Sequence, residues 1–367
     1  MATLNGIQLS EGFYWEAVRP LLGQYFPGLA HAAALLGNGS EVLGYDDTTS
    51  TDHHWGPRVQ LFLRPGDYDT SAAQLHAMLA ERLPKRFGGY PTNFSEPDQR
   101  DHGVQRLQEI EEGPVNHRVE VLTPAAFVWQ QLNFDLAQPL QLLDWLTFPE
   151  QKLLTITAGA VFHDAVGLID IRRLFAYYPE DIWLYLLAAG WARVGQEEHL
   201  MGRAGQVGDE LGSALIGSRL VRDIMRLCFL MERSYAPYPK WFGTAFRRLR
   251  SGPELYPVLQ QALAAESWQD REVQLRLAYE YVARMHNTLG VTPLLPEQTR
   301  AFFGRPFQVI ALHGFAEALW ERIQDPEVRA LAEETLIGSI DQISDNVDLV
   351  TNGRFRFALR NLYEIEA

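Results

Sequence analysis

Cysteine is nearly absent from this sequence of 367 residues, because Cys228 is the only one. A single cysteine excludes a disulfide framework within the chain and a zinc site built from several thiolates. Cys228 lies in the apolar run 225–231, so we expect a buried side chain and not a nucleophile. No apolar run approaches the roughly 18 residues needed to cross a membrane. Residues 1–5 also lack the features of a signal peptide. These absences predict a cytoplasmic protein without a membrane partner.

Positive charge is also scarce. The chain has 32 lysines and arginines against 46 aspartates and glutamates, a net charge of −14, and its pI is about 5.2. Sequence-independent binding to nucleic acid needs a broad basic face that releases counterions. We therefore expect no DNA partner, although a local basic pocket for a nucleotide stays compatible with this charge.

The remaining composition is that of a globular protein, with 47% hydrophobic and 21% charged residues. The length suffices for two domains. Strand-like alternation occurs before residue 124, and helical periodicity dominates after it. We predict an α+β fold with two domains: a small mixed sheet with flanking helices in residues 1–145, and a larger all-helical domain in residues 146–367.

The element boundaries follow from periodicity and from turn residues. We predict strands over 30–37, 58–64 and 117–123, a turn over 64–67, and N-terminal-domain helices over 8–26 and 71–87. The later helices are predicted over 149–158, 170–177, 179–195, 197–231, 238–250, 253–264, 268–289, 296–303, 307–323, 326–345 and 353–364.

Ligand-binding chemistry is concentrated between the first two predicted strands. Gly39-Ser40 follows an apolar run and opens a short segment that we expect to form one or two helical turns. Glycine lets backbone N–H groups approach a phosphate, and the Ser40 hydroxyl can add a further contact. Asp52 precedes the next strand, with His54 two residues later. Mg²⁺ is commonly held by one or two carboxylates together with phosphate oxygens, so Asp52 is a candidate metal ligand.

The pattern Gly39-Ser40, Gly44, Ser50-x-Asp52-x-His54 resembles the signature of the DNA-polymerase-beta-type nucleotidyltransferase superfamily, which includes kanamycin nucleotidyltransferase. The wider context of residues 44–58 resembles an uncharacterised bacterial branch known only as a domain of unknown function. Two departures stand out. One extra residue separates Ser50 from Asp52, and His54 replaces the second carboxylate.

The resemblance implies a role for residues outside this motif. A third carboxylate of the superfamily comes from a later strand, and Glu120 in the strand 117–123 matches it by position and type. It would complete the metal site or act as general base. Related enzymes bind the triphosphate through a lysine of the helical domain. Lys240 matches by context, and the first 240 residues contain only two others, Lys85 and Lys152. Arg58 would also neutralise phosphate charge.

These residues lead to a predicted function. The chain would transfer a nucleoside monophosphate from a nucleoside triphosphate to an acceptor hydroxyl, with release of pyrophosphate. Gly39 and Ser40 would hold the phosphates, and Mg²⁺, or Mn²⁺, would be the cofactor. The acidic pI favours a small-molecule acceptor over a protein or a tRNA. The sequence indicates neither base preference nor oligomeric state.

Other interpretations stay open. Gly39 and Gly44 are also typical turn residues, and Glu120 can be an ordinary exposed strand glutamate. His54 suits Mg²⁺ less well than a carboxylate, so a degenerate, non-catalytic protein that binds a nucleotide or another ligand is the main alternative. A metal hydrolase centred on residues 52–54 would need further ligands, for which His117 and His163 are weak candidates.

The helical region contains two unusual patterns. Four glycines interrupt residues 202–212, and we expect another backbone or a ligand to approach closely there. The second pattern is a charged face on the following helix, where Arg219 and Asp223 are spaced for an ion pair. This face, which also carries Arg222 and Arg226, is either a salt-bridge ladder between helices or part of a ligand site.

Overall fold

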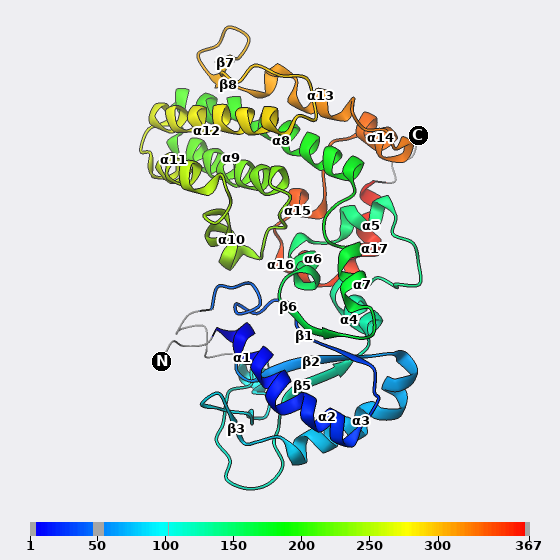
Figure 1. Ribbon diagram of the computed structural model, residues 1–367. Helices are drawn as coiled ribbons and strands as arrows, with labels where there is room; N and C mark the ends of the chain where they lie inside the picture. Colours follow the sequence, from blue (N-terminus) through cyan, green and yellow to red (C-terminus); the bar gives the residue numbers. More distant parts are fainter. Residues whose placement is uncertain (1–4, 47–54, 102, 364–367) are drawn as a thin grey trace. The chain divides into compact units, whose positions relative to one another are not determined.

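The described part of the chain contains a four-stranded mixed sheet and a large helical region (Figure 1). The predicted α+β fold is thereby confirmed. This computed structural model describes residues 5–46, 55–101 and 103–363. Within that part, no helix is long and apolar enough to span a bilayer.

Two compact units divide the chain, and each takes two segments. The first unit consists of Met1–Pro139 and Lys152–Ala176. The second consists of Leu140–Gln151 and Tyr177–Ala367. Because the chain passes between the units more than once, their limits do not follow a single cut such as the one predicted after residue 145.

The sheet of the first unit has the strand order β5-β2-β1-β6. Its strands are β1 (His31–Leu35), β2 (Arg58–Leu63), β5 (Arg118–Leu122) and β6 (Ala160–Asp164). β1 pairs antiparallel with both β2 and β6, whereas β2 and β5 are parallel. The predicted strands 30–37, 58–64 and 117–123 are confirmed with shorter bounds.

Alternation along β2 and β5 gives the sheet two different faces. Val59, Leu61 and Val119 are buried in one hydrophobic core, as residues two apart on a strand point to the same side. That core includes residues of a helical stretch that confirms the predicted helix 8–26: α1 (Gly6–Phe13), the π-helix η1 (Tyr14–Val18) and α2 (Arg19–Tyr25). On the opposite face, Phe62 meets Phe127 of α4 (Pro124–Leu132) at 5.6 Å between ring centroids.

β6 was not predicted, and Gly159 explains how it forms. The predicted helix 149–158 is confirmed as α6 (Glu150–Thr157), and Gly159 follows it with φ of 75°. A Cβ atom at this position would lie 2.1 Å from the carbonyl oxygen of Leu35. Only glycine therefore allows the chain to turn back beside β1 and pair there.

The predicted turn over 64–67 is wrong. Pro65 opens α3 (Pro65–Arg82), because proline at the first helical position has a suitable φ and needs no N–H donor. The helix also ends earlier than the predicted residue 87, and a short hairpin of β3 (Arg86–Phe87) and β4 (Tyr90–Pro91) follows. The remaining elements of the first unit are η3 (Gln99–Asp101) and α7 (Leu168–Leu174).

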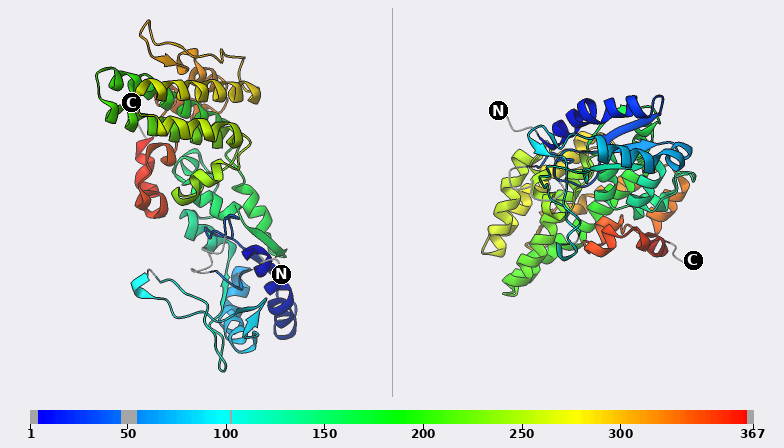
Figure 2. Two further views of the ribbon diagram at one scale, coloured as in Figure 1. Left: turned by 90° about the vertical axis from the view of Figure 1, so that its left-hand side faces the viewer. Right: turned by 90° about the horizontal axis from the view of Figure 1, so that it is seen from below.

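Four helices form the main layer of the second unit, and all views show them side by side (Figures 1 and 2). They are α8 (Glu180–Gln206), α9 (Glu210–Met231), α11 (Gly252–Ala264) and α12 (Trp268–Leu289). Shorter elements complete the unit: α5 (Leu142–Thr147), α10 (Pro239–Phe246), η4 (Ala311–His313), α13 (Phe315–Trp320), α14 (Pro326–Glu334), α15 (Ile340–Ile343), α16 (Val347–Thr351), η5 (Gly353–Phe355), α17 (Arg356–Leu359) and η6 (Arg360–Leu362).

The helix predictions in this unit are wrong in three places. Residues 335–339 divide the predicted helix 326–345 into α14 and α15. The break near residue 196 lies instead at 207–209, where Gly208 adopts φ of 84° and Asp209 caps α9 by accepting from the backbone N–H of Gly212. Residues 296–303 and the start of 307–323 form the hairpin β7 (Arg300–Ala301) and β8 (Gln308–Val309). Gly304 in the loop has φ of 78°, which is unfavourable in a helix.

Two of the four glycines in residues 202–212 make room for aromatic side chains. A Cβ atom on Gly202 would lie 2.6 Å from the Phe307 ring, and one on Gly205 would lie 2.2 Å from the Trp268 ring. The predicted close approach is therefore real, but the approaching groups are side chains that pack on α8.

We expect Gly159→Ala to lower the free energy of unfolding of the first unit by at least about 2 kcal/mol, because it combines a left-handed φ with a backbone clash. Denaturant unfolding would measure this loss. Gly23→Ala is the matched control, since a Cβ there meets nothing within 4 Å in α2. Equal stabilities of the two variants would contradict this account of β6.

Glu198 of α8 makes a pH-dependent contribution to the second unit. Its buried carboxylate accepts from the backbone N–H groups of Ile310 and Ala311, at 2.7 and 3.1 Å. Burial raises its pKa from 4.5 to about 7. A raised folded-state pKa means that this stability is present below the unfolded-state value and is lost as pH rises through the folded-state value.

We therefore expect the free energy of unfolding of the wild type to fall relative to Glu198→Gln between about pH 4 and pH 8, by on the order of 3 kcal/mol. Urea unfolding at a series of pH values gives the difference curve. The exposed Glu317→Gln serves as control. A difference curve that is flat in pH would show that Glu198 is not protonated in the folded state.

Candidate functional site

The turn that contains Gly39 and Ser40 follows β1 directly. The backbone N–H of Gly37 donates to the carbonyl oxygen of Thr155 at 3.2 Å, which fixes where the chain leaves the sheet. Backbone bonds from Leu43 to Gly39 at 3.1 Å and from Tyr45 to Ser40 at 2.8 Å then form one compact turn. The expected helical segment is thus a hydrogen-bonded turn, and no α-helix forms over residues 39–46.

Gly39 leaves room for the side chain of its neighbour Glu41. A Cβ atom on Gly39 would lie 2.6 Å from both carboxylate oxygens of Glu41. Glu41 is itself buried and forms an ion pair with Arg58, the first residue of β2. The turn after β1 is therefore fastened to the start of β2 by a largely buried pair, whose side chains are 6% and 16% exposed.

This pair restricts the Arg58 side chain. One nitrogen of its guanidinium is bonded to Glu41, so the side chain is held in place. Its Nε atom is buried and has no hydrogen-bond partner among the described residues. The predicted contact of Arg58 with a phosphate stays a prediction.

Glu120 lies on the polar face of the sheet, in register with Gln60 across the parallel strands β2 and β5. Gln60 donates to the Glu120 carboxylate at 3.3 Å through Nε2 and accepts from the backbone N–H of Leu36 at 2.9 Å through Oε1. A single amide thus connects Glu120 to the end of β1, three residues before Gly39. The Glu120 side chain is 51% exposed, which leaves it accessible from solvent.

Arg118 completes this polar face. Its guanidinium lies 3.6 Å from Glu120 and donates to Gln105 at 3.1 Å. Burial lowers the pKa of Arg118, and the nearby charge of Arg58 lowers it further, whereas Glu120 and Glu41 raise it. The charges of these two arginines and two glutamates therefore balance one another.

The described residues do not include the centre of the predicted motif. Asp52 and His54 both lie outside the described residues. Within the described ranges, no group of three or more histidine, cysteine, aspartate or glutamate side chains is arranged to hold a metal ion. The predicted metal set of Asp52, His54 and Glu120 thus stays a prediction.

Lys240 belongs to the second unit and lies in the first turn of α10. Its ammonium group is 4.9 Å from the centroid of the Trp241 ring, and the residue is exposed. Proline at the first position of α10 sets this geometry. The predicted contact with a triphosphate stays a prediction.

The charged face of α9 is a network between helices. Arg219 donates to Glu197 of α8 at 2.8 Å, in place of the predicted bond to Asp223. Asp223 instead accepts from Arg193 of α8 and from Arg222, both at 3.3 Å. The ladder interpretation is therefore correct for these residues.

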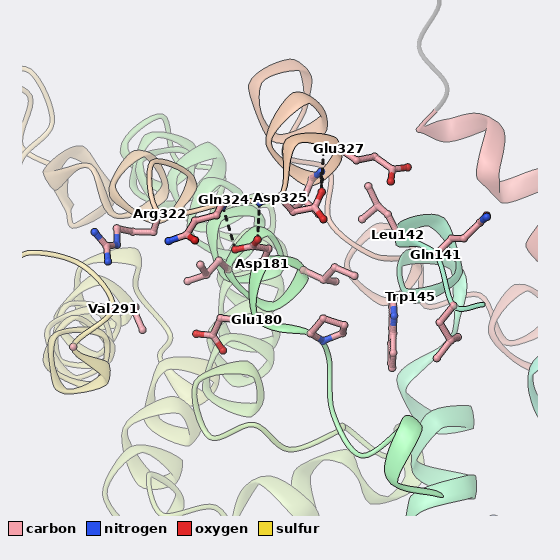
Figure 3. A pocket seen from close by; sticks show the side chains of 16 residues that line it. Gln141, Leu142, Trp145, Glu180, Asp181, Val291, Arg322, Gln324, Asp325 and Glu327 are labelled. Carbon is pink, nitrogen blue, oxygen red and sulfur yellow. Dashed lines mark hydrogen bonds between the residues drawn. The ribbon is translucent and has the colours of Figure 1, made fainter. Parts of the chain in front are cut away.

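A broad hollow of about 880 Å³ in the second unit is lined by many polar side chains (Figure 3). Two of its carboxylates are already used within the fold. Asp181 accepts from the backbone N–H groups of Gln324 and Asp325 at 3.3 and 2.7 Å, and Glu180 pairs with Arg233 at 2.5 Å. These two carboxylates thus anchor neighbouring segments of the second unit.

Sequence reasoning did not single out Glu41, Gln60 or Arg118. The signal for Gln60 and Arg118 was present, because each lies two residues from another polar residue on the same strand face. Glu41 gave no such signal, since its role depends on a distant arginine.

Comparison with known proteins adds little detail. Residues 145–242 match a family model described as a domain of unknown function (DUF4037). That range includes Lys240 but none of the site residues predicted before residue 145. A nucleotidyltransferase-like protein from Exiguobacterium sibiricum 255-15 is similar at 11% sequence identity and a TM-score of 0.32, over 75% of this chain and 78% of that chain. This score is too low to establish a shared fold. No curated protein matches the chain.

We expect Glu41→Gln to lower the free energy of unfolding of the first unit by about 3 kcal/mol, because it leaves the Arg58 charge buried without its partner. The double variant Glu41→Gln/Arg58→Gln should recover at least half of this loss. A double-mutant cycle from urea unfolding measures the coupling. Additive effects of the two changes would show that the pair does not fasten the turn.

Proposed function

We propose that the first unit catalyses metal-dependent nucleotidyl transfer, in which a nucleoside monophosphate moves from a nucleoside triphosphate to an acceptor hydroxyl. The observation that carries this proposal is the connection through Gln60. It ties Glu120 to the end of β1, next to the turn of Gly39 and Ser40. A carboxylate and a phosphate-binding turn are the two parts that the chemistry requires close together.

Each predicted residue has a role in this proposal. Gly39 and Ser40 bind the phosphates, Asp52 and Glu120 provide carboxylates, and Arg58 and Lys240 neutralise phosphate charge. Glu120 accepts the proton of the acceptor hydroxyl. The hydroxyl oxygen then forms a bond to the α-phosphorus, and the bond from that phosphorus to the pyrophosphate oxygen breaks.

The residues are suited to a divalent cation. Among the described residues, the exposed Glu120 carboxylate lies 3.6 Å from Arg118 and accepts a bond from Gln60, and its two oxygens can accept further bonds. Asp52 would supply the second oxygen ligand and His54 a nitrogen ligand. Oxygen ligands suit Mg²⁺, and the imidazole favours Mn²⁺ over Mg²⁺. When bound, the cation would neutralise negative charge that develops on the phosphates.

The acceptor in this proposal is a small molecule. A net charge of −14 disfavours a long footprint on RNA, which depends on many phosphate contacts. A small acceptor needs only local contacts near Glu120.

The test is transfer of label from α-³²P-labelled ATP, GTP, CTP or UTP to metabolites of a cell extract, with Mg²⁺ or Mn²⁺. We expect Asp52→Asn and Glu120→Gln to lower the transfer rate by at least about 100-fold. Asp69→Asn and Glu112→Gln, both at exposed positions outside the proposed site, are the controls and should leave it unchanged.

Two results would contradict the proposal in different ways. Nucleotide binding without transfer or pyrophosphate release, under either metal, would favour the non-catalytic alternative. Transfer that survives Asp52→Asn and Glu120→Gln would place the chemistry elsewhere in the chain.

A further inference from the structure

The helix α12 carries a stripe of exposed and half-buried side chains along most of its length. Its members recur at spacings of three and four residues, and residues so spaced share one face of a helix. They are Asp270, Val273, Leu277, Tyr281 and Arg284. Val273 is 50% exposed and Leu277 is 49% exposed, although both are large apolar residues. The residues of α12 that pack into the second unit lie on the other side of the helix.

Opposite charges lie at the two ends of this stripe. Asp270 is in the first turn of α12, where its carboxylate accepts from the hydroxyl of Ser267 at 2.6 Å. Arg284 lies toward the other end, and its guanidinium is 5.5 Å from the centroid of the Tyr281 ring. Both charged residues are exposed, so their charges face solvent. The stripe is thus acidic at one end, apolar in the middle and basic at the other end.

The order of these residues is complementary to itself when it is reversed. Leu277 is seven residues from both Asp270 and Arg284, and four residues from both Val273 and Tyr281. In a second α12 that runs antiparallel with Leu277 against Leu277, each aspartate meets an arginine and each valine meets a tyrosine. In a parallel pair, like charges would meet instead. Charge complementarity therefore favours an antiparallel pair that is related by a two-fold axis.

A hollow at the basic end of the stripe gives room for side chains of a second helix. Its volume is about 310 Å³, and Tyr281, Arg284 and Met285 are among the residues that line it. Val273 of an antiparallel copy reaches this end of the stripe, where the tyrosine ring and the methionine side chain offer apolar surface. Removal of apolar surface from water on both copies would supply free energy of association.

We propose that the outer face of α12 is a dimer interface whose occupant is α12 of a second copy of this chain, in antiparallel orientation. Leu277 lies at the two-fold axis, and two pairs of Asp270 and Arg284 close the ends of the interface. A single helix stripe is small compared with permanent interfaces, so this dimer dissociates on dilution. None of these residues has a role in the proposed nucleotidyl transfer, so either proposal can fail without the other.

Sedimentation velocity of the full chain at a series of concentrations measures the dimer. We expect a monomer–dimer equilibrium with a Kd on the order of 10 µM. Leu277→Lys places two positive charges at the axis and should raise the Kd at least about tenfold. Leu215→Lys is the matched control, because Leu215 is 57% exposed on α9, and it should leave the Kd unchanged. A chain that stays monomeric, or a dimer that Leu277→Lys does not weaken, would overturn the proposal.

Charge reversal tests the antiparallel orientation. Asp270→Lys and Arg284→Glu each bring like charges together, and each should raise the Kd at least about tenfold. The double variant Asp270→Lys/Arg284→Glu restores two opposite pairs and should recover most of the affinity. Circular dichroism melting curves report folding of each variant. Losses that simply add in the double variant would refute the antiparallel arrangement.

A cysteine at the axis tests the two-fold geometry. Cys228, the only cysteine of the sequence, is buried, so Leu277→Cys supplies the one exposed thiol. Under mild oxidation we expect a disulfide-linked dimer, because the two Cα atoms at the axis lie within the roughly 7 Å that a disulfide requires. Leu215→Cys should form far less of this product. Equal cross-linking of the two variants would show that the interface lies elsewhere.

Discussion

The candidate site depends on the register of two parallel strands. Because Gln60 of β2 faces Glu120 of β5, one amide can bind a carboxylate on one side and the end of β1 on the other. A slip of one residue would turn Glu120 toward the apolar core and bring Val119 to the polar face. Burial of Val59, Leu61 and Val119 therefore fixes not only the fold but also the position of the carboxylate.

Several acidic residues fasten loops and helix ends of the second unit. Part of the net charge of −14 therefore has a structural role. Glu198, Asp181 and Glu232 each accept from two successive backbone N–H groups, so each fastens a loop or a helix end. A carboxylate used in this way satisfies donors that would otherwise be buried without partners. The excess of acidic residues disfavours a nucleic-acid partner, but some of these residues are present because they form internal bonds.

Periodicity and turn residues predicted the strands and helices that depend on the sequence nearby. The strands β1, β2 and β5 and helices such as α12 were visible in periodicity and turn residues. β6 was not, because its five residues are all half-buried and show no alternation. The bond from Arg219 to Glu197 was missed for a related reason: spacing along one helix suggests Asp223, but the carboxylate of a neighbouring helix lies closer. Likewise, Glu41 and Gln60 act through partners far away in the sequence.

The arginines of α9 show why the spacing along one helix does not identify the partners of a charged side chain. Arg219 and Arg222 each have a carboxylate within 3.3 Å, so their charge is used inside the fold and little is left for a ligand. Arg226 lies on the same helix face, yet the nearby Glu150 and Asp341 direct their oxygens to backbone N–H groups. Sequence spacing treats the three arginines alike. What separates them is the set of acceptors that neighbouring segments supply, which the spacing along one helix does not show.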